Sequence, residues 1–89
     1  MRIIEGFCLR NVMGRPTVIG ESASLVDFNK LVTLNESAAF LWRSVEGRDF
    51  TLDDLVGMLV SRYQIAEEVA KADAAEILEG WKNVGFIKE

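Results

Sequence analysis

The 89-residue chain lacks histidine altogether and contains one cysteine, Cys8, and one proline. Without histidine it cannot build a Ser/His/Asp or Cys/His catalytic arrangement, or a metal site with histidine ligands. A single cysteine also excludes cysteine zinc clusters and disulfide bonds within the chain. We therefore expect no catalytic residues, no bound metal and no cofactor, and the sequence predicts that the protein is not an enzyme.

Long hydrophobic runs and an excess of positive charge are also missing. No apolar run approaches the roughly 20 residues that span a bilayer, and the N-terminal segment MRIIEGFCLR has no signal-peptide pattern. Ten Lys and Arg residues stand against fourteen Asp and Glu residues, a net charge of −4 that offers no general attraction to nucleic acid. We expect a cytoplasmic protein that binds neither a membrane nor nucleic acid.

The length predicts one domain, spanning residues 1–89, because compact domains contain on the order of 100 residues. A domain of this size buries about 60% of the surface that its unfolded chain exposes. Its 49% hydrophobic content is therefore needed almost entirely for one core. Little remains to enclose a deep catalytic pocket.

The first part of the chain has a β-like pattern of short apolar segments separated by breaks. The segments FCLRNVM, PTVIG and LVTL predict three short strands near residues 7–13, 16–20 and 31–34. Gly14 and Pro16 favour a tight turn, so the first two strands should form a hairpin. The third strand should follow a looser loop over residues 21–30.

The second part of the chain has helical periodicity. Asn35 and Thr51 are typical N-cap residues, and they predict helices that end near Gly47 and Gln64. A third helix is expected over about residues 66–83, before Gly85. Its predicted apolar stripe consists of Ala70, Ala74, Ile77, Trp81 and Val84.

The expected fold class is therefore α+β, a small winged-helix-like domain with a three-stranded antiparallel sheet followed by three helices. A winged-helix outline raises the question of DNA binding, which the charge of the third helix argues against. Lys71 and Lys82 are outnumbered by five acidic residues there, so this helix carries a net charge of −3. A helix that reads DNA needs basic side chains facing the phosphates and the base edges.

The third predicted strand, Leu31 to Leu34, is uncharged and contains no proline. As an edge strand it would present unpaired N–H and C=O groups on which an extended peptide could dock. As an interior strand it would present none, and periodicity does not separate the two interpretations. Asp73, beside the apolar stripe of the third helix, could bind a partner's backbone or a nearby donor of the domain itself.

Three stretches, LVTLNESAAFLW, FTLDDLVGMLVSRY and KADAAEILEGWKNVGFI, resemble the PqqD-like family. The resemblance covers about residues 18–87. The namesake of this family is the peptide chaperone of pyrroloquinoline quinone biosynthesis. These patterns contain no catalytic signature, so they identify a scaffold more directly than they identify a partner.

The resemblance implies a recognition element for a ribosomally made precursor peptide. The leader part of that peptide would add as a strand beside the third strand and lie in a groove against the third helix. The backbone of Leu31, Val32, Thr33 and Leu34 would pair with the peptide. The side chains that would line the groove are those of Val69, Asp73 and Leu78.

The partners implied by the resemblance are the precursor leader peptide and a separate peptide-modifying enzyme, for which the radical SAM class is one candidate. The alternative is a structural or homodimerising domain, in which the same sheet edge pairs with a second copy and no peptide is bound. The sequence names neither the precursor, nor the modifying enzyme, nor the oligomeric state.

Overall fold

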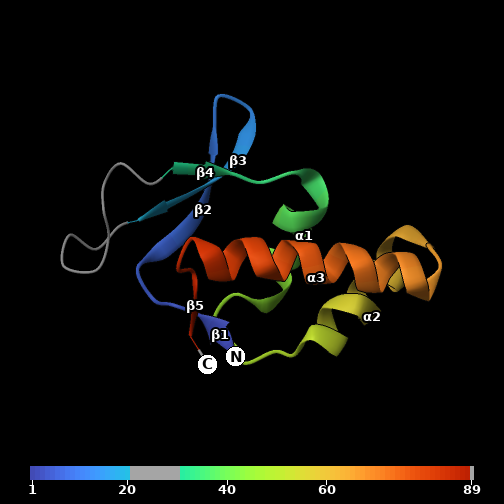
Figure 1. The fold of residues 1–89 in the computed structure, drawn as a ribbon. Coiled ribbons are helices and arrows are strands. Elements are labelled where there is room, and N and C mark those ends of the chain that lie inside the picture. The colour runs from blue at the N-terminus through green and yellow to red at the C-terminus, as the bar shows by residue number, and fades with distance from the viewer. Residues whose placement is uncertain (21–30, 89) are drawn as a thin grey trace.

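The computed structural model describes residues 1–20 and 31–88. It confirms the expected α+β class, a three-stranded antiparallel sheet together with three helices (Figure 1). The predicted loop over residues 21–30 lies outside the described residues. The sheet consists of β2 (Phe7–Val12), β3 (Arg15–Gly20) and β4 (Leu31–Thr33), and the helices are α1 (Glu36–Val45), α2 (Leu52–Tyr63) and α3 (Glu67–Asn83).

The sheet has the order β2-β3-β4, which leaves β4 at one edge. A two-residue turn joins β2 to β3, since Val12 pairs with Arg15. Both turn residues have positive φ, 52° at Met13 and 82° at Gly14. Two positive φ values are what the commonest two-residue hairpin turn requires, so the predicted hairpin is confirmed.

Side chains cap the first two helices at the predicted residues. Asn35 Oδ1 accepts a hydrogen bond from the Ala38 N–H at 2.8 Å, which fixes the start of α1 directly after β4. Thr51 and Asp54 form a reciprocal capping box at the start of α2. No side chain caps α3, which begins one residue after the N-cap position Ala66.

A second, two-stranded sheet pairs the two ends of the chain and is not predicted by the sequence. It consists of β1 (Arg2–Ile3) and β5 (Ile87–Lys88), which lie beside the marked termini in Figure 1. The Ile4 N–H also donates to the Phe86 carbonyl at 2.8 Å. Two-residue strands carry no readable periodicity, so their pairing became visible only in the folded chain.

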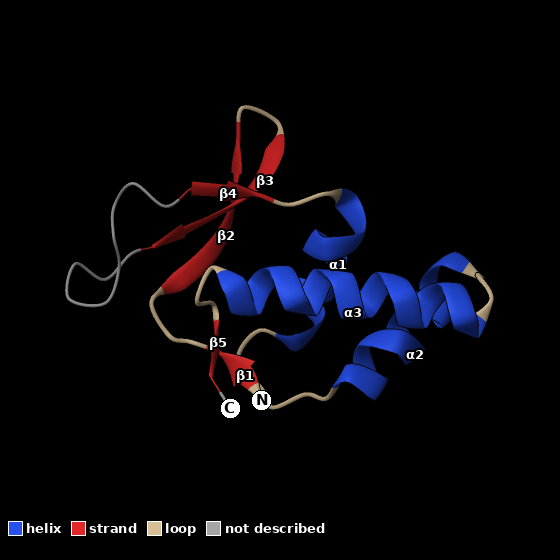
Figure 2. Cartoon of the chain, in the orientation of Figure 1, coloured by secondary structure: helices blue, strands red, loops and turns tan. Residues whose placement is uncertain are grey.

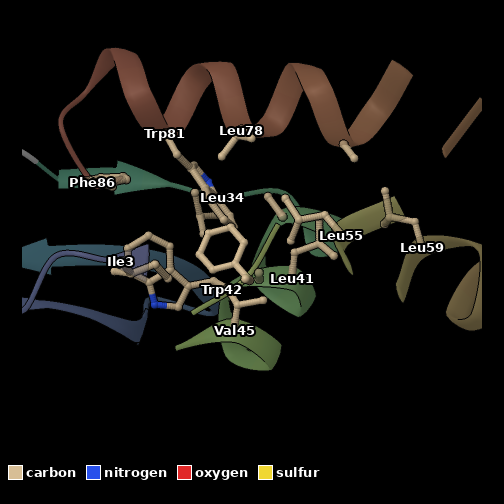
Figure 3. Close-up of a cluster of buried hydrophobic side chains, with 14 of the residues drawn as sticks. Ile3, Leu34, Leu41, Trp42, Val45, Leu55, Leu59, Leu78, Trp81 and Phe86 are labelled. Carbon is tan, nitrogen blue, oxygen red and sulfur yellow. The ribbon is translucent and has the colours of Figure 1, made fainter. Parts of the chain in front are cut away.

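The core is built from side chains of all three helices and of the strands, and it contains both tryptophans, as predicted (Figure 3). The ring of Trp42 packs edge to face against Trp81, with centroids 5.4 Å apart, and against Phe86, at 5.3 Å. Such aromatic pairs add about 0.5–1.5 kcal/mol each beyond the area that they bury. This cluster holds the C-terminal end of α3 in place.

The buried stripe of α3 differs from the predicted one. Leu78 is buried, at 5% exposure, whereas Ile77 is only partly buried at the edge of the core. Both residues fit a helical repeat that contains Ala74 and Trp81, so periodicity alone did not decide between them. In the folded chain α3 packs against α2 and, through Trp81, against Trp42 of α1. Leu78 is buried there, and Ile77 lines a groove together with residues of β4.

No helix among residues 1–20 and 31–88 has the length and apolar character needed to cross a bilayer.

Candidate functional site

The outer edge of β4 is unpaired within the described part of the chain, where β3 is its neighbour in the sheet (Figure 2). The Leu34 N–H donates to the Pro16 carbonyl at 2.8 Å. Opposed residues of antiparallel strands alternate between hydrogen-bonded and non-hydrogen-bonded pairs. Val32, which lies opposite Val18, therefore directs its backbone groups toward β3, and Thr33 and Leu31 direct theirs outward.

A groove of about 310 Å³ runs between β4 and the C-terminal half of α3. Val32, Thr33 and Leu34 line it on the strand side. The helix contributes four residues of one face, and the segment after the helix contributes two more: Glu76, Ile77, Gly80 and Trp81, then Val84 and Phe86. The groove therefore lies between a largely apolar helix face and a strand in which the backbone groups of Thr33 point outward and have no partner among the described residues.

Electrostatically the groove is nearly neutral. Of the described residues that line it, Glu76 is the charged one, and it is exposed on α3. Desolvating an apolar wall with a single carboxylate at its rim costs little compared with desolvating a charged cleft. The groove suits an extended, largely apolar segment of a ligand.

A family model described as Coenzyme PQQ synthesis protein D (PqqD) matches residues 19–87. The chain belongs to the PqqD family. The match begins near the end of β3 and includes β4, all three helices and every residue that lines the groove. A comparison with curated proteins found no match, and neither did a comparison with solved structures.

The structure places the predicted strand residues of this PqqD family member at the groove. Val32, Thr33 and Leu34 all line it, although β4 itself ends at Thr33. Leu31 belongs to β4 through its backbone and lies opposite Ile19. The four predicted positions therefore form a continuous segment along the free edge.

The three predicted helix residues are not brought together. Leu78 is buried in the core and does not line the groove. Val69 and Asp73 are exposed on the helical row that continues through Ile77 and Gly80, but they lie closer to the start of α3. Asp73 lines a neighbouring hollow of about 380 Å³ beside Asn35, Glu36 and Ser37 at the start of α1.

Sequence reasoning missed Ile77, Gly80 and Val84 as residues of the groove. Ile77 and Val84 belong to the predicted apolar stripe of the third helix, which favours burial in the core because apolar residues at helical spacing are usually buried. Gly80 carried a signal that could have been used, since a glycine inside a helix reduces stability and asks for a reason.

Within residues 1–20 and 31–88 there is no cluster of three or more His, Cys, Asp or Glu side chains that could hold a metal ion.

Proposed function

We propose that the protein binds the leader segment of a ribosomally synthesised precursor peptide by strand addition and presents it to a separate modifying enzyme. The observation that carries this proposal is the position of the free β4 edge, with its outward backbone groups at Thr33 and Leu31, directly beside the apolar groove. Membership of the PqqD family supports it, because the namesake of this family is the peptide chaperone of pyrroloquinoline quinone biosynthesis.

Strand addition needs both features of this site. Main-chain hydrogen bonds to an exposed sheet edge provide affinity without regard to sequence, and pockets for alternate side chains provide specificity. The backbone of Thr33 can provide the main-chain hydrogen bonds, since its N–H and C=O point away from β3. The apolar surface that receives side chains of the peptide comes from Ile77 and Trp81 of α3 and from Val84 after it.

The site is suited to binding rather than to catalysis. Its described lining offers one carboxylate and no cysteine or lysine side chain that could act as a nucleophile. The chemistry on the peptide would accordingly belong to a partner enzyme. The domain would contribute the ordered backbone of the leader, which lowers the entropic cost of aligning the peptide with that enzyme.

The test is an affinity capture from cells that contain the protein, followed by mass spectrometry of bound peptides. The parent domain should retain a short ribosomal peptide, and Thr33→Pro, which removes one outward N–H, should not. Retention of the same peptide by Thr33→Pro and parent would contradict docking at this edge.

The homodimer alternative predicts a different result from the same two proteins. If the β4 edge pairs with a second copy, the parent will sediment as a dimer in analytical ultracentrifugation and Thr33→Pro will sediment as a monomer. A parent that is monomeric at micromolar concentration and retains a peptide supports the recognition function.

A further inference from the structure

Gly80 interrupts the apolar wall that α3 and the following residues present to the groove. Ile77 precedes it by three positions and Val84 follows it by four, so the three positions share one face. The two flanking side chains are apolar and partly buried, whereas Gly80 is exposed and has no side chain. The wall therefore has a notch between Ile77 and Val84.

Nothing within the described protein explains a glycine at this position. Apart from its two chain neighbours and the nearby backbone of its own helix, a Cβ atom built on Gly80 would meet no atom within 4 Å, and the φ of Gly80 is not in the positive range that favours glycine. Alanine would also be the better residue inside a helix. What glycine does supply is space and access to the helix backbone from the groove.

The groove that contains the notch is, as a whole, large enough for a bulky side chain of a ligand. The groove measures about 310 Å³, and an apolar cavity of roughly 150 Å³ already holds a molecule of benzene. Ile77, Val84 and Trp81 contribute hydrocarbon to its walls, and Glu76, one turn before Gly80, contributes an exposed carboxylate. A polar side chain would lose its hydration against the hydrocarbon part of these walls, and an acidic one would also be repelled by Glu76.

We propose that Gly80 is a specificity-determining position, over which the bound peptide places one large apolar side chain of the Leu, Ile or Phe type. This inference rests on the proposed peptide-binding function, and it defines which peptides the groove selects. Because successive side chains of a strand point to opposite faces, only every second residue of the peptide faces α3. The two neighbours of the selected residue in the peptide are free to vary.

The experiment selects binders from a phage-displayed library of random dodecapeptides on four proteins: the parent, Gly80→Leu, Gly57→Ala and Thr33→Pro. The parent should enrich peptides with one large apolar residue at a fixed position. Gly80→Leu fills the notch and should shift that position to Gly, Ala or Ser. The best peptide of the parent should bind Gly80→Leu at least about tenfold more weakly in calorimetry, a loss of roughly 1.4 kcal/mol.

Gly57→Ala is the matched control. Gly57 is also an exposed glycine inside a helix, and a Cβ built on it would likewise meet nothing within 4 Å beyond its chain neighbours and its own helix backbone, but it lies on α2 and does not line the groove. Gly57→Ala and Gly80→Ala should both raise the melting temperature, because both improve helix propensity. Gly57→Ala should leave the selected sequences unchanged.

The outcomes separate this inference from the proposed function. If the parent enriches peptides that Thr33→Pro does not, and Gly80→Leu enriches the same sequences as the parent, the role of Gly80 is overturned and peptide binding stands. If Gly57→Ala enriches different sequences from the parent, the specificity role of Gly80 is likewise overturned. If the parent enriches nothing beyond the Thr33→Pro background, the proposed function fails and this inference fails with it.

Discussion

Met13 adopts a backbone conformation that its side chain does not favour. Its φ of 52° is left-handed, and its side chain is 96% exposed, so no packing compensates for the conformation. A non-glycine residue in this region costs roughly 1–2 kcal/mol, and asparagine is among the residues that tolerate it best. The following residue, Gly14, already suits the second position of the turn.

The first prediction follows from this strain. Met13→Asn should stabilise the domain by about 1 kcal/mol, because Asn-Gly is the preferred pair for such a turn and no buried contact is lost. The measurement is the midpoint of urea unfolding. Met13→Val should lower the midpoint, since a β-branched residue is least tolerant of positive φ. Equal midpoints for the parent and both variants would refute strain at Met13.

At the scale of the element, β4 is a three-residue strand with two different sides within the plane of the sheet. One side is bonded to β3, the other is unpaired among the described residues, and Val32 and Thr33 line the groove. The backbone bond from Leu34 to Pro16 fixes the alternation, so it decides which residue of β4 serves which side. The pattern of the sequence could not make that assignment.

The second prediction uses two adjacent prolines. Val32→Pro should destabilise or unfold the domain, because it removes an N–H that is directed at β3 and disturbs a partly buried side chain. Thr33→Pro should keep the circular dichroism spectrum of the parent, since its N–H points outward and its side chain is exposed. In calorimetry with a peptide that the parent binds, Thr33→Pro should lose about 1 kcal/mol or more.

The comparison between these variants is itself decisive. Equal unfolding of both would show that Thr33 also donates within the domain, and docking along the β4 edge would have to be abandoned. A folded Val32→Pro together with an unfolded Thr33→Pro would reverse the assigned sides of the strand.

At the scale of the whole molecule, charge separates this fold from a DNA-binding protein of similar outline. The chain has a net charge of −4, and α3 carries five acidic residues against Lys71 and Lys82. Lys71 Nζ lies 3.7 Å from Glu67 Oε1, one turn earlier on the same helix. This ion pair further reduces the availability of Lys71 to phosphate. The exposed face of α3 would repel a polyanion.

The third prediction is therefore that the protein shows no sequence-selective binding to duplex DNA at physiological salt. Fluorescence anisotropy with labelled duplexes of different sequence is the measurement. The doubly substituted Lys71→Ala, Lys82→Ala protein is the control and should behave like the parent. Selective binding by the parent that this control loses would contradict the prediction and favour a DNA-binding function.

The sequence by itself determined the order and type of the main elements and much of their boundaries. Local rules were sufficient because the signals lie within a few residues of each other, as with the Asn35 cap, the Thr51 capping box and the Gly14 turn. It also determined the acidic charge and the absence of histidine, since neither depends on folding.

Tertiary structure alone decided which side of each element is buried in the core and which side lies at the groove or points outward. Ile77 and Leu78 are adjacent and equally apolar, and only the packing of α3 against α1 and α2 buried Leu78 and left Ile77 at the groove. The pairing of β1 with β5 and the outward side of Thr33 likewise depend on contacts between distant segments. Periodicity fixes how residues are spaced around an element, but the direction that an element faces is set by its neighbours in space.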